Sequence, residues 1–570
     1  MRVLSRSGSR LVLVVAALTI LNQASASGQS GQATPPAQAA AQPLVTGPVR
    51  QLTVDEAVKL ALEQNLNIQV ERLNPQVQDL SVAEARTAWT PSFSAGVFGQ
   101  NQDAPPSSFL SGGTDVITTQ NAGTELGLSQ LLPWGTNYAV NWDSARMTTN
   151  NIFTQFDPQL TSNLSAFVEQ PLLRNFRIDS ARWQLLASLN TREIADIDLR
   201  QTIALTERSV RNAYWEYKYA LASLEVARQS LELAQESLRN TRSRVEIGTL
   251  APIDIVEAES EVANREEAVI LAEAAIGQSE DRLRALVFDP NTPEYWNMRI
   301  EPIDPVPFEV QAVDVDGAVR RALTERTDVA QTKKTIERTS LDERFYRNQT
   351  MPDINVRVDY NATALAGTQL LRGEGAFPPP VIGSVQRPFS DLLSDVFSSQ
   401  FPTWRFGLNV NYPIGRSSAE ATLAQTRLLA RQSNLQLRDL ELQVTTQVRD
   451  AARQLMANAK RVEATRASRV LFERRLEAEE KKFAAGMSTS FQVFQAQRDL
   501  STARNAELRA TLDYNLSQVD FETVQVAPVG GAGSFSPTLG GSIGGLTGTT
   551  TTTGTGTGTQ GTGGNTGNIP

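Results

Sequence analysis

The feature that most constrains the fold is a seven-residue apolar repeat that occurs twice in the chain. Its first copy is apolar at six positions: Val210, Tyr217, Leu224, Leu231, Leu238 and Val245. Its second copy lies 238 residues later and has one charged member: Val448, Leu455, Val462, Arg469, Leu476 and Phe483. A stripe with this period packs as a coiled-coil seam. Two long helices are therefore predicted, over about 177–245 and 419–483, each roughly 100 Å long.

Both predicted helices end in the same reversal signature, "VEIGTLAPIDIVEAES" (245–260) and "FAAGMSTSFQVFQAQR" (483–498). Gly248 and Gly486 suit the C′ position of a helix, where φ is positive. Pro252 suits the first turn of a following helix. We therefore expect each long helix to turn back into a shorter one, over about 252–286 and 490–523. Any helical hairpin would use these residues equally well.

The rest of the chain is also built twice. "LTVDEAVKLALEQN" (52–65) and "VDVDGAVRRALTER" (313–326) are amphipathic helix starts 261 residues apart, with Thr or Asp available as N-caps. Each leads to a helix, a proline and an alternating segment. This pattern predicts a first repeat over 51–287, a Pro-rich linker over 288–312 and a second repeat over 313–525.

The alternating segments predict strands. Apolar and polar residues alternate strictly in "INVRVDY" (354–360) and "WRFGLNVNY" (404–412). Such a strand is more often half-buried in a soluble sheet, but about nine residues with aromatic ends also match a membrane β-barrel. The long helices favour the second interpretation, because a soluble coiled coil gives these strands no role.

Two strands per half give four per chain, and four strands cannot close a barrel in lipid. We therefore expect three copies to share a wall of about 12 strands. The first half is less regular. Besides "SFSAGVFG" (92–99) and "SNLSAFVEQ" (162–170), it holds an alternating stretch at 125–144. That stretch either adds a hairpin to the barrel or forms an extracellular elaboration.

The N-terminus predicts export. Three arginines, an apolar run over 11–21 and the small residues Ala24-Ser25-Ala26 are typical of a secretory signal, assigned here to 1–26. Composition predicts a flexible leader over 27–50 and a disordered Gly/Thr-rich tail over 526–570.

Composition also limits the chemistry. The chain has no cysteine and no histidine, which rules out disulfides, His-based catalysis and most zinc sites. We expect neither an enzyme nor a cofactor or metal, since no carboxylate pair has a recognisable catalytic spacing. The net charge of −9 at pH 7 argues against nucleic acid as a partner.

Together these features resemble the TolC-like outer-membrane efflux proteins over about residues 51–525. The resemblance is carried by the duplicated plan, by the two reversal motifs and by the prolines in "VEQPLLRN" and "NVNYPIGRS". It implies a mostly α fold with a membrane β-barrel: a homotrimer with a 12-stranded barrel in the lipid of the outer membrane and an α-helical barrel in the periplasm. Such a protein is the passive exit duct of a tripartite efflux or type I secretion system. Its partners are a periplasmic adaptor (membrane fusion) protein and an inner-membrane pump of RND, ABC or MFS type.

The resemblance also implies roles for residues at the two reversals. Six would dock the adaptor: Gly248, Thr249, Leu250, Gly486, Met487 and Ser488. Five would form a periplasmic gate: Asp254, Glu257, Phe483, Gln492 and Gln495. Phe483 stands where family members have a hydrogen-bonding tyrosine, and the two glutamines stand where they have ring carboxylates. We therefore expect a gate with less charge and weaker cation sensitivity, although Asp254 is equally suited to be a first-turn helix acid.

A second hypothesis is a periplasmic coiled-coil adaptor or scaffold without a membrane barrel. It explains the heptads and the signal but not the alternating strands. Within the first hypothesis the cargo is open between small molecules, polypeptides and ions. The absence of His and Cys, with only six Met, disfavours a soft-metal relay.

Overall fold

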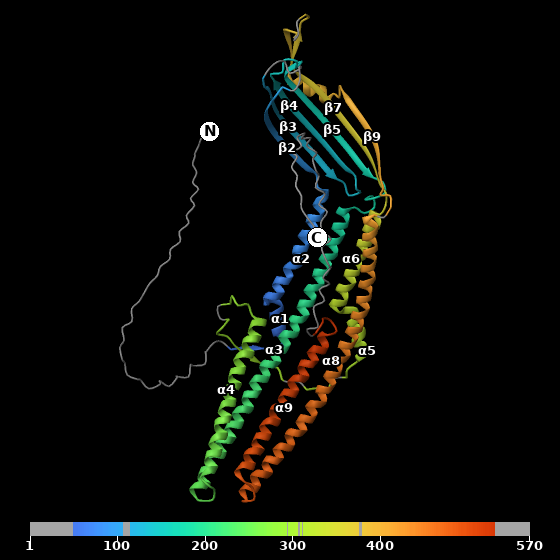
Figure 1. Cartoon of the computed structure of the whole chain (residues 1–570). Coiled ribbons are helices and arrows are strands. Elements are labelled where there is room, and N and C mark those ends of the chain that lie inside the picture. Colours follow the sequence, from blue (N-terminus) through green and yellow to red (C-terminus); the bar gives the residue numbers. More distant parts are fainter. Residues whose placement is uncertain are drawn as a thin grey trace, which may run out of the picture.

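The computed structural model describes residues 49–106, 115–292, 295–305, 308–310, 312–375, 379–415 and 417–529. They form an elongated molecule with helical hairpins at one end and a curved sheet at the other (Figure 1). The predicted signal peptide and most of the predicted leader and tail lie outside the described residues. None of the described helices is both long enough and apolar enough to cross a membrane.

The helical body is built around two helices of 67 residues each, α3 (Ser180–Glu246) and α8 (Ser418–Ala484). Each turns back into a shorter helix, α4 (Ile253–Val287) and α9 (Ser490–Thr523). The predicted hairpins are thus confirmed to within about three residues. The heptad member that breaks the apolar series, Arg469, forms ion pairs with Glu473 and with Glu507 of α9.

A pair of shorter helices leads from the body to the sheet in each half. These are α1 (Val54–Gln64) and α2 (Leu66–Arg86) in the first half, and α5 (Val315–Glu325) and α6 (Thr327–Gln349) in the second. The N-caps are those the sequence predicts, because Thr53 and Asp314 accept hydrogen bonds from the first turns of α1 and α5. A single 3-10 turn, η1 (Thr87–Trp89), joins α2 to the sheet.

A small parallel sheet anchors the middle of the body. It pairs β1 (Val49–Leu52) with β6 (Arg299–Pro302), so part of the Pro-rich segment belongs to the folded core. Tyr217 of α3 is 1% exposed and donates a hydrogen bond to the carbonyl of Ile300 at 2.7 Å. Burial raises the pKa of Tyr217 to about 12. The hydroxyl thus remains a neutral donor that fixes β6 against α3.

The larger sheet holds seven strands in the described residues and is antiparallel throughout. They are β2 (Ser92–Ala104), β3 (Ile117–Leu131), β4 (Asn137–Thr149), β5 (Phe156–Pro171), β7 (Asp353–Arg372), β8 (Val381–Arg387) and β9 (Pro402–Asn411). Strands β2 to β5 and β7 lie side by side in that order.

Strands β8 and β9 share the remaining edge of β7. They pair with its residues 367–372 and 353–362, respectively, while β5 occupies the other edge. A short helix, α7 (Phe389–Phe397), connects them. At the end of the sheet nearest the helices there are consequently six strands per chain, because β8 lies farther along β7.

The expectation of four strands per chain is wrong, because the first half contributes four strands instead of two. The stretch at 125–144 forms most of β3 and β4, and both lie inside the sheet. The turn between them sits at the helical end, where the Gln130 side chain donates to the carbonyl of Trp89. Gly135 in this turn has φ +93°, a conformation that favours glycine.

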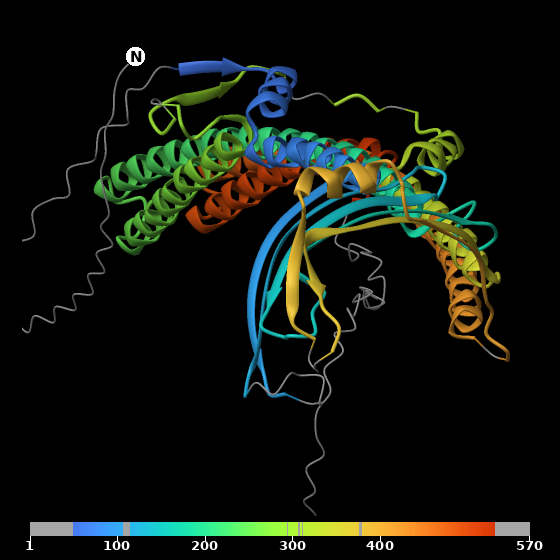
Figure 2. The same cartoon turned by 90° about the horizontal axis from the view of Figure 1, so that it is seen from above.

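The register places apolar side chains of all six strands on one face. These are Phe93, Val97, Leu126, Leu128, Val140, Trp142, Leu164, Val168, Val358, Tyr360, Trp404 and Phe406. Helix α7 packs Leu392 and Val396 against this face at Ala364 and Ala366. Seen from above, the sheet bends into an arc (Figure 2).

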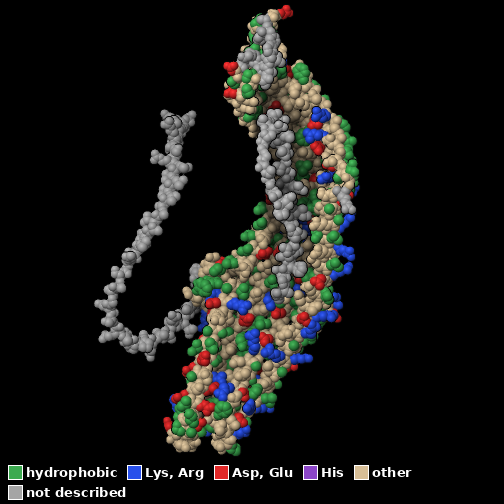
Figure 3. Space-filling view, in the orientation of Figure 1, with side chains coloured by type: hydrophobic (Ala, Val, Ile, Leu, Met, Phe, Trp, Pro, Cys, Tyr) green, Lys and Arg blue, Asp and Glu red, His purple; other side chains and the backbone are tan. Residues whose placement is uncertain are grey.

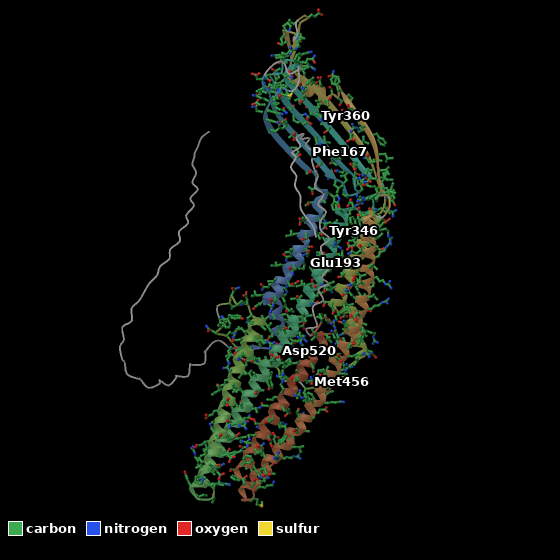
Figure 4. All side chains as sticks on the ribbon, in the orientation of Figure 1. Phe167, Glu193, Tyr346, Tyr360, Met456 and Asp520 are labelled. Atoms are coloured by element: carbon green, nitrogen blue, oxygen red, sulfur yellow. The ribbon has the colours of Figure 1, made fainter. Side chains whose placement is uncertain are left out.

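The opposite face of the sheet is polar. Arg357 forms ion pairs with Glu169 at 3.1 Å and Asp359 at 2.9 Å, and its guanidinium lies 4.1 Å from the centre of the Phe167 ring. Figure 4 places Phe167 and Tyr360 in the middle of the strands. Charged side chains gather in the hollow of the arc in Figure 3. A curved wall that is apolar outside and polar inside suits a water-filled duct through lipid.

Candidate functional site

The candidate site lies where the two hairpins reverse, at the lower end of Figure 1. Gly248 and Gly486 have φ values of +78° and +75°, and the helix-ending hydrogen bonds around them match. Thr249 N–H donates to Arg244 at 2.9 Å, and Met487 N–H donates to Lys482 at 2.8 Å. This six-to-one bond defines a Schellman motif with glycine at C′. The sequence prediction of two C′ glycines is confirmed.

The tips present apolar side chains to solvent. Ile247 and Met487 are 74% and 75% exposed, and Ile253 and Phe491 are also exposed. Among the six predicted docking residues, four are exposed, while Leu250 and Ser488 are half-buried. Ile247, Ile253 and Phe491 were not among the predicted residues, although an isoleucine on either side of a helix reversal is a signal in the sequence.

Asp254 connects the two hairpins. One carboxylate oxygen accepts from the N–H of Ala251 at 3.1 Å, as a first-turn acid does. The other accepts from the hydroxyl of Ser490, at the start of α9, at 2.8 Å. Ser490 is buried. Asp254 is therefore a first-turn acid that also contacts the second hairpin, and its role in a gate stays a prediction.

Phe483 makes the second contact between the hairpins. The guanidinium of Arg244 lies 4.4 Å from its ring centre, and Arg244 also donates to its carbonyl at 3.4 Å. The ring packs against the cluster of Leu476 and Val493 between α8 and α9. A cation–π contact thus joins α3 to α8 without the hydroxyl that a tyrosine would supply.

The other predicted gate residues do not bridge the hairpins. Gln492 accepts a hydrogen bond from Ser488, and Gln495 binds Asp499 and Arg498, all within the α8–α9 hairpin. The side chain of Glu257 forms neither a hydrogen bond nor an ion pair with the described part of the chain.

A third contact, between Glu261 and Arg498, was not predicted. Glu261 of α4 is 4% exposed, and its carboxylate lies 2.7 Å from Arg265 and 3.0 Å from Arg498 of α9. Since an unpaired buried carboxylate is costly, both cations are needed. Arg498 follows Ser490 by eight residues, so this contact lies about two helical turns above the first. Arg498 belongs to the "FQAQR" motif, but sequence alone does not reveal which helix faces it.

A groove of about 360 Å³ runs between the hairpins beside these contacts. Its lining includes the carboxylates of Glu236 and Glu480 and the apolar side chains of Phe483 and Val493. Desolvation in the groove, together with Glu236 and Glu477, raises the pKa of Glu480. Among the described residues no cluster of three or more acidic side chains is placed to hold a metal ion.

A duplicated body of long helical hairpins, continued by a curved sheet with one apolar and one polar face, defines an outer-membrane channel with a helical extension. Residues 57–287 and 318–524 match the family model described as "Outer membrane efflux protein". The chain therefore belongs to the outer membrane efflux protein family. It is a TolC-like transport protein of the outer membrane, and its helical body lies in the periplasm. No curated protein sequence matches it significantly.

Solved structures have the same fold at low sequence identity. A membrane protein from Pseudomonas aeruginosa is 16% identical, with a TM-score of 0.59, and the match covers 83% of this chain and 90% of that one. The Campylobacter jejuni CmeC outer membrane channel is 12% identical, with a TM-score of 0.58 and coverage of 83% and 85%. The open-state MtrE outer membrane channel of Neisseria gonorrhoeae is 16% identical, with a TM-score of 0.56 and coverage of 83% and 89%.

Proposed function

We propose that this protein is the passive exit duct of a tripartite efflux or type I secretion system. Three copies form a continuous wall, and cargo leaves through its lumen. An inner-membrane pump of RND, ABC or MFS type supplies the energy, and a periplasmic adaptor connects the pump to the duct. The two-faced sheet and the duplicated hairpins support this assignment, because an adaptor or scaffold has no use for a curved sheet with an apolar outer face.

The observation that carries the proposal is the set of three contacts between the hairpins that lie nearest the tips, below the hydrogen bonds of Ser501 with Ser230 and Arg265. They are Asp254 with Ser490, Arg244 with Phe483, and Glu261 with Arg498. Each joins a helix of the first hairpin to a helix of the second. Breaking all three lets the hairpins separate at the tips without changing either hairpin, and this motion would open a periplasmic gate.

The adaptor docks on the tips themselves. Six residues form the proposed docking surface: Gly248, Thr249, Leu250, Gly486, Met487 and Ser488. The exposed Ile247 and Met487 support this role, because apolar side chains at a solvent-exposed turn have no packing function in the single chain. Docking draws the tips outward and breaks the three contacts.

Two measurements test the proposal. The native mass of protein extracted from the outer membrane in detergent is expected to be that of three chains. In planar bilayers, Asp254→Ala and Ser490→Ala should each raise the closed-state conductance, and the double variant should add little because both remove one contact. Ser488→Ala is the matched control, since its hydroxyl binds only within its own hairpin. A monomer in detergent, or unchanged conductance in both variants, would refute the trimer or the gate, respectively.

A further inference from the structure

The sheet has two open edges, formed by β2 in the first half and by β9 in the second. Among the six strands at the helical end, β3, β4, β5 and β7 pair on both sides, whereas β2 pairs only with β3 and β9 only with β7. Strand β8 also pairs only with β7, but farther from the helices. Apolar side chains on both edge strands are exposed, with Val97 at 84% and Phe406 at 74%. In lipid, unpaired backbone groups and an open edge are not tolerated. The edges therefore require a partner strand.

We infer that β2 of each copy pairs with β9 of the next, so that the assembled wall contains 18 strands. This inference rests on the trimer of the proposed function and adds the number of strands, the pairing edges and the width of the duct. Strands β3 and β4 are integral parts of this wall, and the expected 12 strands would follow only if each chain contributed four.

The inserted hairpin has the surface of a membrane wall. Leu126, Leu128, Val140 and Trp142 lie on the same face as Val97 and Val168 of the neighbouring strands. On the other face of the hairpin are polar side chains such as Asp143, whose carboxylate accepts a hydrogen bond from Asn163 of β5. An extracellular elaboration would not continue the apolar band of its neighbours in register.

The stagger of the strands also fits a closed wall. A line of directly opposed residues crosses the sheet through Ser92, Ser129, Ala139, Phe167, Asp359 and Arg405. It starts at the helical end of β2 but meets β9 six residues before its helical end at Asn411. That stagger is about 20 Å along the strands over about 24 Å across five strand spacings. The strands thus tilt by about 40°, within the range of closed membrane barrels.

The width of wall that six strands occupy also matches the width occupied by the helices that continue them. Four helices meet the sheet, α2, α3, α6 and α8 (Figure 1). At interaxial distances of about 9 to 10 Å they occupy about 36 to 40 Å of wall. Six strands tilted by about 40° occupy about 38 Å. The duct therefore keeps its width from the helical part into the membrane. At this tilt, 18 strands give a radius of about 18 Å to the backbone, against about 12 Å for 12 strands.

Disulfide cross-linking tests the pairing, because the chain has no cysteine and every disulfide must come from introduced residues. Val97→Cys on β2 is combined in turn with Trp404→Cys, Phe406→Cys and Leu408→Cys on β9, which covers neighbouring registers on the apolar face. One of the three pairs should give covalently linked dimers and trimers in denaturing electrophoresis of oxidised membranes. Each single cysteine serves as a control for random collisions.

The competing 12-stranded wall predicts a different neighbour for β5. If the hairpin of β3 and β4 lies outside the wall, β5 pairs with β2, and Trp142 of β4 no longer lies opposite Leu164 of β5. The pair Trp142→Cys and Leu164→Cys would then form no disulfide within the chain. That result, or no β2–β9 link in a detergent-extracted trimer, would overturn the 18-strand wall while leaving the proposed function intact. A native mass of one chain would instead refute the trimer on which both rest.

Discussion

A guanidinium nitrogen of Arg498 lies 3.0 Å from a carboxylate oxygen of Glu261, and this ion pair joins helix α9 of the second hairpin to helix α4 of the first. The carboxylate is almost completely buried, whereas Arg498 is about one-third exposed. Separating the hairpins would therefore remove one of the two cations that pair with a buried carboxylate, which costs free energy.

Replacing Arg498 should open the tips. Arg498→Ala leaves Glu261 with Arg265 alone, so the closed state should lose about 1 to 3 kcal/mol relative to the open state. The measurement is single-channel conductance, with a leak that rises about tenfold. Arg475→Ala is the control, because Arg475 pairs with Asp499 inside the second hairpin. An equal leak in both variants would show that the effect is not specific to the contact between hairpins.

Replacing Gly486 should impair docking of the adaptor without impairing assembly of the trimer. A side chain at this position meets open space but must adopt a positive φ. Gly486→Trp should abolish export and leave the amount of trimer unchanged, because a large side chain blocks the exposed turn. Gly486→Asn is the matched control, since asparagine tolerates this backbone conformation at little cost. Export assays and native gels measure the two effects, and normal export by the Trp variant would place the docking surface elsewhere.

Replacing Asp198 should change how stability depends on pH. Desolvation on α3, with a smaller contribution from Glu71, raises the pKa of its carboxyl above the ordinary value of 3.8. A raised pKa means that the folded state binds the proton more tightly, so this group's contribution is most favourable below pH 3.8 and is lost as the pH rises through the raised pKa. Asp198→Asn should therefore raise the melting temperature at pH 7, with the gain disappearing near pH 3.5.

The control for this effect is Asp196→Asn, two residues away on the same helix. Asp196 is 42% exposed and pairs with Arg192, so its replacement should not stabilise the protein at neutral pH. The measurement is the melting temperature of both variants as a function of pH. A stabilisation of Asp198→Asn that is the same at every pH would show that the effect is not caused by titration.

The hydroxyl of Tyr217 should contribute measurably to the core. Tyr217→Phe leaves the buried carbonyl of Ile300 without this donor and should cost about 1 to 2 kcal/mol in the free energy of unfolding. Tyr219→Phe, on the same helix, is the control because its hydroxyl has no hydrogen bond in the described part of the chain. Denaturant unfolding measures both, and equal losses would mean that the Ile300 contact is not the cause.

The helices could be predicted because their signals are local. Heptad spacing and the C′ glycines located α3 and α8 within about three residues. The extra strands were harder to assign, because β3 contains Gly123 and Gly127 within a run of threonine and asparagine that weakens its alternation. Whether such a stretch joins a sheet is decided by its neighbours, and here β2 and β4 supply the matching apolar residues.

The contact between Glu261 and Arg498 was not predicted for a similar reason, because it too depends on neighbours that are distant in the sequence. Arg498 and Glu261 are 237 residues apart and belong to different hairpins. Periodicity shows which face of a helix is apolar, but it does not show which of several similar helices packs against that face. The contact therefore depends on how the two hairpins pack beside one another, which the sequence pattern does not determine.

The equal length of α3 and α8 limits how the chain can change during evolution. Both hairpin tips lie at the same depth because each long helix has 67 residues. Inserting one heptad into a single half would lower that tip by about 10 Å and leave its partner behind. The two tips would then no longer end at the same level. A change in the length of one long helix would consequently need an equal change in the other to keep both tips at one level.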